Sequence, residues 1–579
     1  MSAPNRNALW ARTVVDELAA AGVDAVCITP GSRSTPLTVA FARHDDVRVF
    51  SHLDERSSAY FALGRARRTG EVTPLVCTSG TAAANFHPAV LEADRGRVPL
   101  LLLTADRPPE LRDSGANQTV DQEKLFGDAV RWYRDVAEPE PTARKLRSLR
   151  TTAARAVTEA TGAPAGPVHL NFPFRKPLEP AAVDGDVPPD IESRAVRGRD
   201  GAFVETTTGA PELDREALAA VADALEVERG LVVAGPADPP GPDPEAITAL
   251  AHTTGFPVLA DPLSGLRFGG HTRVTTTVGG YDGYLDPRLD DALDAEVVFR
   301  FGASPTSKPL RKYLARTDAR QLLVDPAGGW REAEFTASDL VVADPSRLAG
   351  RLSRAVSGPD SAGWRERWER AERIHWEAVD EESDFFEGRL LADVADLTPE
   401  PGTVFVSNSM PVRDADRFAR PVAASYTVLG NRGTSGIDGI VSTALGAGSA
   451  TADHLTLVVG DIAYYHDMNG LLALARCDVD ATVVLVNNDG GGIFHMLPIE
   501  EFDPPFTEQF KTPHGLDFEP TGELYDLEFA RVEGDDFRDA YADAVAREGT
   551  QVLEVRTDAE ASHQVRERLK ERVVDSLLD

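Results

Sequence analysis

A carboxylate and two amides stand at the ends of neighbouring apolar segments. Asp461 ends LTLVVGD (455–461), and Asn487 and Asn488 lie in TVVLVNNDGG (482–491), with 25 residues between Asp461 and Asn487. Open α/β sheets bind ligands at the carboxyl ends of parallel strands, where such side chains come together. Mg²⁺ prefers oxygen ligands and often completes its shell with phosphate, which glycines at 490–492 would let the backbone approach. The spacing therefore predicts a metal-bound diphosphate at a strand end.

Each of these residues also has an ordinary structural interpretation. An aspartate often caps a helix, and an asparagine pair is common in turns. Glu55, in HLDERSS (52–58), has the composition of a first helical turn, where the helix dipole favours a negative charge. The combination of Asp461 and the asparagines, each at a strand end with one helix between them, is the stronger signal.

Several cationic side chains lie in Gly-, Ser- and Thr-containing loops that follow predicted strands. A single exposed arginine is usually part of a weak surface ion pair. Arginine is also the residue that binds a carboxylate with two parallel hydrogen bonds, so this clustering in an acidic chain favours substrates with several carboxylates. The cationic residues are Arg33, Arg107, Lys308, Arg413 and Arg432, and the same loops offer the hydroxyl groups of Ser32 and Ser409.

Composition limits the class of protein. At 579 residues the chain is too long for one hydrophobic core. It has no apolar run of 18 residues and no basic-then-apolar N-terminus, so neither a membrane span nor export is expected. The three cysteines, Cys27, Cys77 and Cys477, show neither metal-ligand nor disulfide spacing. A reducing, cytoplasmic location is the simplest interpretation.

The net charge of −33 argues against nucleic acid and anionic membranes as partners, because both would be repelled. The acidic residues are spread through the chain, and only seven of the 60 basic residues are lysine. This pattern favours adaptation to high salt, which screens self-repulsion. An ordinary acidic protein is the alternative.

Alternation of apolar segments and helical patterns predicts an α/β fold with three doubly wound parallel-sheet domains. A Pro-, Gly- and Asp-rich linker at about 179–211 follows the first set, and the charged helix 364–382 closes the second. The expected domains are 1–185, 186–384 and 385–579.

The combined segments resemble thiamin-diphosphate enzymes. The resemblance implies that the three expected domains are pyrimidine-binding, middle and diphosphate-binding domains, in that order. Within them, the chain is similar to the branch that joins 2-oxoglutarate to isochorismate in menaquinone biosynthesis. The similarity rests on the first and third domains, and the middle domain matches weakly, mainly around Lys308. One departure is Ile462, where many such enzymes have glycine after the metal-binding aspartate. The matching stretches are PGSRSTPLT, DER, TSGTAAAN, LLTADRPPELRDSGANQ, SNSMPVRD, NRGTSGIDG, VVGD, NN and GGIFHMLP.

The resemblance implies a role for each matching residue. Thiamin diphosphate and Mg²⁺ or Mn²⁺ are the implied cofactors, with Asp461, the Asn488 side chain and the Gly490 carbonyl as metal ligands. Glu55 would activate the cofactor at its ring nitrogen N1′, and Gln118 would orient reacting groups. The implied cofactor-binding residues are Glu55, Ser409, Ile437, Asp461, Asn488, Gly490 and Ile493. The implied substrate-binding residues are Ser32, Arg33, Arg107, Gln118, Lys308, Ser409, Arg413, Arg432, Ile493, Phe494 and Leu497.

The resemblance also implies the reaction and the assembly. 2-Oxoglutarate would lose CO₂ on the cofactor, and its remainder would add to isochorismate in a 1,4-addition. The family usually builds its site between two chains, which implies a homodimer or homotetramer. Ile493, Phe494 and Leu497 could instead be a helix that packs into the core.

Two other functions compete with this interpretation. An acetohydroxyacid synthase or another thiamin-dependent 2-oxoacid decarboxylase would share Asp461, the asparagines and Glu55, but it needs fewer cations. A non-catalytic nucleotide-binding protein is the other alternative. A non-catalytic scaffold belongs to the same alternative. Nucleotide binding lacks support, because no GxGxxG opens a helix after the first strand and no GxxxxGK[ST] occurs.

Overall fold

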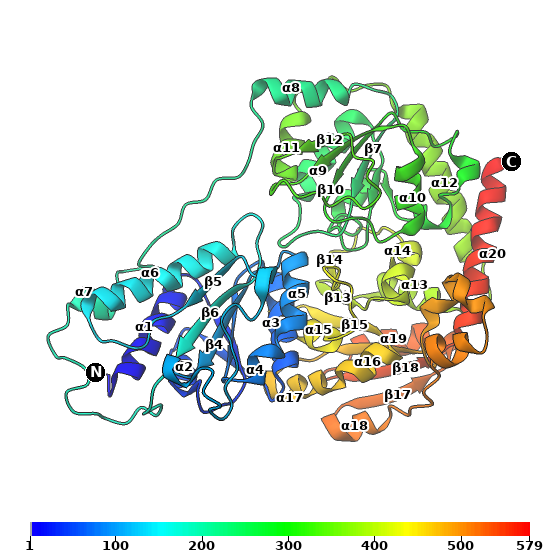
Figure 1. The fold of residues 1–579 in the computed structure, drawn as a ribbon. Helices are drawn as coiled ribbons and strands as arrows, with labels where there is room; N and C mark the ends of the chain where they lie inside the picture. The colour runs from blue at the N-terminus through cyan, green and yellow to red at the C-terminus, as the bar shows by residue number, and fades with distance from the viewer. Residues whose placement is uncertain (1–2) are drawn as a thin grey trace. The chain divides into compact units, whose positions relative to one another are not determined.

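The computed structural model describes residues 3–579, and three six-stranded sheets form its framework (Figure 1). Neighbouring strands within these sheets pair in parallel, as the alternation of strands and helices predicts. The chain divides into two compact units. Unit 1 contains the residues up to Thr208 together with Asn431–Ala452 and Asp467–Val479, and unit 2 contains Gly209–Gly430, Asp453–His466 and Asp480–Asp579.

The sheet of unit 1 has the strand order β2-β1-β3-β4-β6-β5. Its buried apolar residues pack mainly against α1 (Arg6–Ala20), α2 (Thr35–Ala42) and α6 (Ala143–Ala160). Figure 1 shows α3 (Glu55–Thr69) and α5 (His87–Arg95) on the other side of this sheet from α1 and α6. The strands are β1 (Ala25–Ile28), β2 (Arg48–Ser51), β3 (Thr73–Cys77), β4 (Leu100–Asp106), β5 (Trp132–Asp135) and β6 (Val168–Pro173).

A close helix crossing joins α3 to α15 (Ile440–Gly448), so part of the predicted third domain packs within unit 1. Glycine permits this approach on both helices. A Cβ on Gly64 would lie 1.9 Å from the carbonyl oxygen of Thr443, and a Cβ on Gly446 would lie 2.0 Å from that of Phe61. Since Glu55 begins α3, this crossing helps to hold the N-terminus of that helix.

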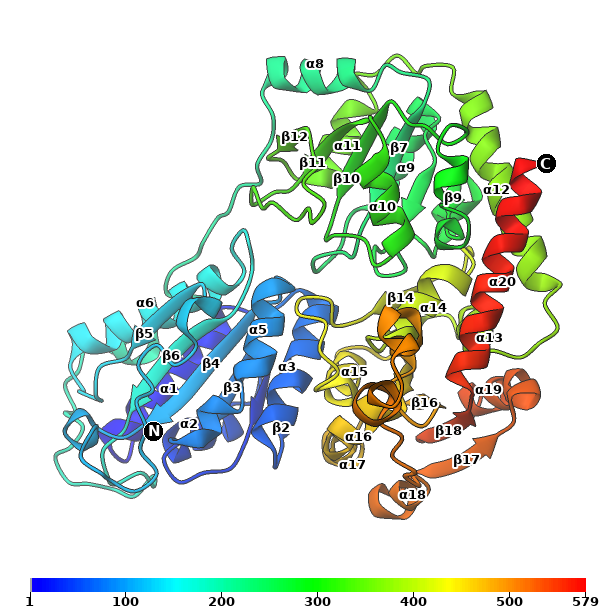
Figure 2. The same ribbon diagram turned by 45° about the vertical axis from the view of Figure 1, so that its right-hand side comes forward.

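The first sheet of unit 2 has the order β12-β11-β10-β7-β8-β9. One core lies among α8 (Arg215–Ala224), α9 (Pro244–Thr254) and α11 (Pro345–Leu352). A second lies among α10 (Lys308–Arg316), α12 (Ala362–Asp380) and α20 (Ala559–Leu578), and both views show α20 beside α12 (Figures 1 and 2). The strands are β7 (Gly230–Ala234), β8 (Val258–Ala260), β9 (Thr277–Val278), β10 (Val297–Phe301), β11 (Arg320–Val324) and β12 (Asp339–Val341).

The second sheet of unit 2 has the order β14-β13-β15-β16-β18-β17. Its core includes apolar residues of α13 (Glu387–Leu397), α14 (Met410–Phe418) and α19 (Phe537–Val545). Among residues 3–579, no helix combines the length and apolar character that crossing a bilayer requires. The strands are β13 (Gly402–Val406), β14 (Tyr426–Leu429), β15 (His454–Gly460), β16 (Thr482–Asn487), β17 (Glu528–Val532) and β18 (Gln551–Arg556).

Candidate functional site

Asp461 and Asn488 lie at the same sheet edge, as their sequence positions predict. β15 and β16 are adjacent and parallel, with Gly460 opposite Val486. Asp461 is the first residue of α16 (Asp461–Asp467), is only 3% exposed, and its Oδ2 accepts a hydrogen bond from the Gly490 N–H at 3.0 Å. The three residues expected to bind metal are therefore neighbours in unit 2.

The two asparagines have different environments. Asn487 uses both ends of its side chain within the fold: its Nδ2 donates to Glu554 at 2.7 Å, and its Oδ1 accepts from the Asp489 N–H at 3.1 Å. Asn488 donates from Nδ2 to Glu387 at 2.8 Å, while its buried Oδ1 has no hydrogen-bond partner. A buried, unpaired amide oxygen is unfavourable alone and is a suitable ligand for a hard cation.

The donor set fits a divalent ion. Burial raises the pKa of Asp461, which indicates that its carboxylate is poorly hydrated and would gain from a nearby cation. Within residues 3–579, no group of three His, Cys, Asp or Glu side chains could hold a metal. An ion at Asp461 would thus depend on the Asn488 amide and on a backbone oxygen such as that of Gly490.

His514, which sequence analysis missed, also contacts Asp461. The Leu516 N–H donates to its Nδ1 at 3.0 Å, so Nε2 carries the proton and donates to Asp461 Oδ2 at 3.2 Å. The segment that contains His514 lies far from Asp461 in sequence, and its residue pattern offers no signal for this contact.

Gly490 is required for a reason that does not involve phosphate. Its φ is +140°, and a Cβ there would lie 2.0 Å from the carbonyl oxygen of Lys511. The Gly491 N–H donates to that same carbonyl at 2.7 Å. The glycines therefore allow the segment around Lys511 to close over the end of β16.

The apolar residues after this turn are not core residues. Ile493 and Phe494 are partly buried in a short 3₁₀ turn, Gly492–Met496, and Leu497 is 42% exposed. Phe494 packs edge-on against Phe510, with ring centroids 5.5 Å apart. The alternative of a helix packed into the core is wrong for this segment, and its exposed apolar surface is available to a ligand.

Ser409 and Arg413 follow β13. Ser409 stands before the first residue of α14 with a φ of +71°, a strained conformation for a residue with a side chain. Arg413, one turn later, donates from Nη1 to the Ser409 carbonyl oxygen at 2.5 Å. The two residues therefore form one local structure at a strand end.

Lys308 is exposed at the start of α10, after β10. Ser307 caps this helix by accepting from the Leu310 N–H at 3.1 Å, and its hydroxyl donates to Asp282 at 2.6 Å. The Thr306 N–H donates to Asp261 at 2.9 Å. The loop before Lys308 is thus fixed by two carboxylates.

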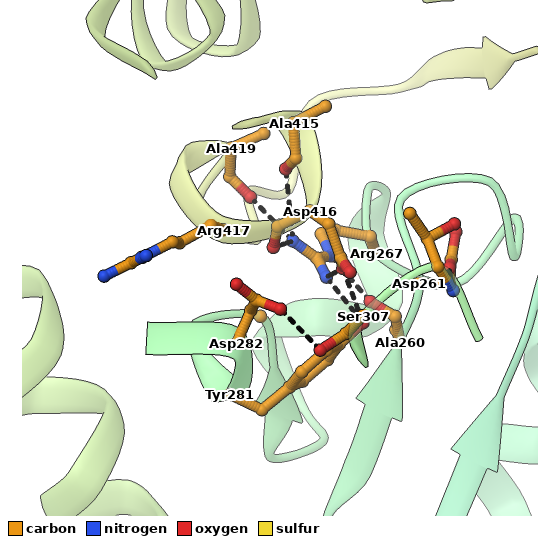
Figure 3. Close-up of polar contacts among 12 residues, drawn as sticks. Ala260, Asp261, Arg267, Tyr281, Asp282, Ser307, Ala415, Asp416, Arg417 and Ala419 are labelled. Atoms are coloured by element: carbon orange, nitrogen blue, oxygen red, sulfur yellow. Dashed lines mark hydrogen bonds and ion pairs between the residues drawn. The ribbon is translucent and has the colours of Figure 1, made fainter. Parts of the chain in front are cut away.

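A buried network around Arg267 joins this region to α14 (Figure 3). Arg267 is fully buried and donates to the Ala260 carbonyl at 2.6 Å and to Asp416 Oδ1 at 2.8 Å. The Tyr281 hydroxyl donates to the same Asp416 oxygen at 2.6 Å. Burial raises the pKa of Asp416. Within unit 2, the helix that carries Arg413 is therefore anchored to the sheet that presents Lys308.

Two arginines of unit 1 lie near each other at strand ends. Arg33, after β1, is 5% exposed and donates from Nη1 to the Phe174 carbonyl at 2.6 Å. Burial, together with the positive charge of Arg107 after β4, lowers the pKa of Arg33. Ser32 is exposed beside them. The pair forms a positive site that an anion would stabilise.

Gln118 adopts a φ of +53° and is fastened to the loop after β3. The Gln118 Nε2 donates to the Ser79 carbonyl at 3.1 Å, and the Ser79 hydroxyl donates to the Gln118 carbonyl at 2.9 Å. Arg107 Nη2 donates to the neighbouring Asn117 carbonyl at 2.8 Å. Gln118 and Arg107 are thereby brought together.

Gln122 is a supporting residue that sequence analysis missed. It is 1% exposed, accepts from the Gly80 N–H at 2.9 Å, and donates to Asn171 Oδ1 at 3.0 Å. In the sequence, the only indication of a role for Gln122 is its position four residues after Gln118.

Glu55 is the first residue of α3, and Asp54 caps the helix by accepting from the Arg56 N–H at 2.8 Å and the Ser57 N–H at 3.2 Å. Glu55 is partly buried. Burial raises the pKa of the Cys77 thiol at the end of β3, and the negative charge of Glu55 adds to this effect. The Glu55 carboxylate therefore lies near the carboxyl end of β3, and all three cysteines are free and buried.

Arg432 and Ile437 belong by their contacts to unit 1. Glu92, which is 1% exposed, accepts hydrogen bonds from the N–H groups of Gly433 at 2.8 Å and Thr434 at 2.6 Å. The Tyr60 hydroxyl donates a hydrogen bond to the side chain of Asp438, which follows Ile437 in the sequence. A buried carboxylate on α5 thus shapes the loop that presents Arg432.

Known protein families match segments that together span most of the chain. Three models of thiamine pyrophosphate enzymes match consecutive segments: the N-terminal TPP binding domain at 10–125, the middle domain at 211–406 and the C-terminal TPP binding domain at 413–555. A solved thiamine diphosphate-dependent 4-hydroxybenzoylformate decarboxylase from Rhodococcus jostii RHA1 shares the fold. Its TM-score is 0.70 at 19% identity, over 95% of this chain and 99% of that one.

Closer relatives define the family more narrowly. A 2-succinyl-5-enolpyruvyl-6-hydroxy-3-cyclohexene-1-carboxylate synthase from Haloquadratum walsbyi is 63% identical, and one from Haloarcula marismortui is 64% identical, each over 100% of both chains. One from Roseiflexus castenholzii is 49% identical over 96% of this chain and 97% of its own. The chain belongs to this synthase family of thiamine pyrophosphate enzymes.

Proposed function

We propose that the chain catalyses the thiamin-diphosphate-dependent decarboxylation of 2-oxoglutarate and the 1,4-addition of the remaining four-carbon unit to isochorismate. The products are 2-succinyl-5-enolpyruvyl-6-hydroxy-3-cyclohexene-1-carboxylate and CO₂. The reaction is a step of menaquinone biosynthesis. The structural observation that supports this most strongly is the unpaired, buried Asn488 Oδ1, two residues before Gly490, whose N–H donates to Asp461. The relatives that match over the full length of both chains are named as synthases of this product, and they support the choice of substrates.

The cofactor supplies a nucleophilic carbon and accepts the electrons released when a 2-oxoacid loses CO₂. Asp461, Asn488 and the Gly490 carbonyl would hold Mg²⁺ or Mn²⁺ and, through it, the diphosphate. Glu55 would hold a proton at the ring nitrogen N1′ of the cofactor's aminopyrimidine. Ser409, Ile437 and Ile493 are the further residues we assign to cofactor contact.

The cationic residues would bind and orient carboxylates. We assign Ser32, Arg33, Arg107 and Lys308 to isochorismate. Arg33 is preorganised for this by its hydrogen bond to Phe174, so little side-chain entropy is lost on binding.

The remaining contacts concern the four-carbon unit and the exclusion of water. Ser409, Arg413 and Arg432 are assigned to its carboxylate, and Gln118 to orienting the reacting groups. Ile493, Phe494 and Leu497 would exclude water, which strengthens each arginine–carboxylate contact.

We further propose a homodimer or homotetramer in the cytoplasm, with each site formed from Glu55 of one copy and the metal-binding residues of another. The resemblance to enzymes that build their sites between chains motivates this assembly. Sedimentation analysis at high KCl tests it, and a monomer with full activity would exclude it.

A two-substrate assay at high KCl tests the proposed function. Purified protein with thiamin diphosphate and Mg²⁺ should release CO₂ and form the named product only when both 2-oxoglutarate and isochorismate are present. Omission of the cofactor after metal chelation should abolish product. Product formed from pyruvate alone would refute the substrate assignment and favour an acetohydroxyacid synthase or a related decarboxylase.

A further inference from the structure

A chain of buried charged side chains runs from Asn488 to α14. Asn488 Nδ2 donates to Glu387 Oε1 at 2.8 Å, and Arg566 Nη2 donates to Glu387 Oε2 at 2.7 Å. Arg566 continues to Asp414, with Nε to Oδ1 at 2.7 Å and Nη2 to Oδ2 at 2.6 Å. Glu387 and Asp414 are each 2% exposed and Arg566 is 3% exposed. The ends of this chain are the Asn488 amide, which we assign to the metal, and Asp414, the residue next to Arg413.

Glu387 determines which end of the Asn488 amide faces it. An ionised carboxylate only accepts hydrogen bonds. Both of its oxygens are in use, because Oε1 also accepts from the Thr557 hydroxyl at 3.0 Å and Oε2 accepts from Arg566. The amide must therefore present its NH₂ group to Glu387, and Oδ1 is directed elsewhere. That Oδ1 is buried without a partner.

Arg566 holds the Glu387 carboxylate in this orientation. It lies between two carboxylates that are both nearly fully buried, and each forms an ion pair with it. Breaking a buried pair by removing one partner leaves an uncompensated charge, so the three groups are mutually dependent. The Glu387 N–H also donates to the Ser562 hydroxyl at 3.3 Å, which connects the start of α13 to α20.

We propose that Glu387 is a positioning residue that orients the Asn488 amide with its oxygen toward the divalent cation. Arg566 and Asp414 extend this support to α14, which carries Arg413. The inference rests on the proposed function, since it assumes that Asn488 binds the metal of the cofactor. Residues that hold a metal ligand in place typically change the metal affinity by about 10- to 100-fold when they are altered.

The variant Glu387→Gln tests the orientation with minimal change of shape. A glutamine side chain has one acceptor and one donor group, whereas Glu387 accepts from both Arg566 and Asn488. The guanidinium will take the acceptor oxygen, because hydrogen bonds from a charged donor are the stronger ones. The NH₂ group of the introduced glutamine then faces Asn488 and reverses its amide. We expect Mn²⁺ affinity, measured by electron paramagnetic resonance with thiamin diphosphate present, to fall about 10- to 100-fold.

A second substitution should restore binding. Asn488→Asp alone places a carboxylate against Glu387, so it too should weaken Mn²⁺ binding at least about 10-fold. In the double variant Glu387→Gln/Asn488→Asp, the introduced glutamine accepts from Arg566 and donates to the introduced aspartate, whose other oxygen faces the ion. The affinity should return to within about threefold of the original protein. A purely structural role for Glu387 gives no such rescue.

Glu372→Gln is the matched control. Glu372 is another buried carboxylate of unit 2, 9% exposed, which accepts from the Gly279 and Gly280 N–H groups at 3.0 and 2.8 Å. Its replacement should lower the melting temperature and leave the Mn²⁺ affinity unchanged.

The outcomes separate the two claims. No Mn²⁺ binding by the original protein would overturn the proposed cofactor site itself. Normal binding by Glu387→Gln, or a double variant as weak as either single one, would overturn the positioning role and leave the proposed function intact. If Glu387→Gln does not fold, Asn488→Asp and the double variant still decide the matter through the presence or absence of rescue.

Discussion

At the residue scale, the site depends on which polar groups the fold leaves unpaired. Asn487 and Asn488 are indistinguishable in sequence, and only their partners separate them: Glu554 and Asp489 satisfy the first, whereas the second keeps a buried free oxygen. Sequence reasoning located the pair through strand ends and the family resemblance. It could not find Glu387, because that residue lies 101 positions away and is brought in by tertiary packing.

Replacing Asp461 by alanine should abolish metal-dependent cofactor binding. Asp461 is the carboxylate among the three residues proposed to bind the metal, and its loss would remove their only charged oxygen ligand. Calorimetric titration with thiamin diphosphate and Mg²⁺ should show no binding, while Asp480→Ala, at an exposed position, should bind normally. Unchanged affinity in Asp461→Ala would place the metal elsewhere.

Lysine substitutions should separate the two substrates. Arg107→Lys is expected to raise the KM for isochorismate about 10-fold or more, because lysine cannot form a bidentate pair with a carboxylate. Arg413→Lys should do the same for 2-oxoglutarate, so each variant is the control for the other. Steady-state kinetics with one substrate saturating measures both effects, and an equal rise for both substrates in either variant would contradict the assignments.

At the element scale, glycines set the position of the helix that carries Glu55. Gly446→Ala would place a Cβ 2.0 Å from the Phe61 carbonyl, a clash with backbone that only movement of α3 or α15 can relieve. Such overpacking costs typically about 1–3 kcal/mol. Denaturant unfolding should show this loss, and Gly363→Ala, whose Cβ meets open space on α12, should show none. Full stability of Gly446→Ala would mean that the crossing is less close than described.

Element prediction succeeded where apolar segments were continuous and failed where they were not. β15 is almost entirely buried and its apolar segment predicts a strand, whereas β17, an edge strand of sequence EFARV with no fully buried residue, was missed. β5, another edge strand, was missed as well, because mixed residues such as WYRD carry little strand periodicity. Edge strands are half-solvated, so their sequences lack the signal of a central strand.

At the scale of the whole molecule, the three-sheet architecture was predictable from strand and helix alternation, but the grouping of segments was not. The residues Asn431–Ala452 fall within the third predicted domain in sequence, yet they pack in unit 1. The close approach of α3 and α15 depends on Gly64 and Gly446, and single glycines inside helical patterns do not identify their partners. The domain bounds 1–185, 186–384 and 385–579 remain predictions.

Acid should destabilise the protein through a buried histidine. Burial lowers the pKa of His169 to about 3, below the value of about 6.5 expected in the unfolded chain. The unfolded state therefore binds the extra proton between these values, and the stabilising contribution present above about pH 6.5 is lost as the pH falls toward about 3. Scanning calorimetry at constant KCl should show that His169→Gln loses less thermal stability than the original protein between about pH 7 and 5. Parallel melting curves would contradict this linkage.

The exchange of the C2 proton of bound thiamin diphosphate with deuterium tests the central claim most directly, because it reports on Glu55 without any substrate. The original protein should exchange this proton at least about 100-fold faster than Glu55→Gln, while calorimetry shows that the variant still binds the cofactor. Equal exchange rates in the two proteins, at equal cofactor occupancy, would contradict the assignment of Glu55 and with it the proposed site.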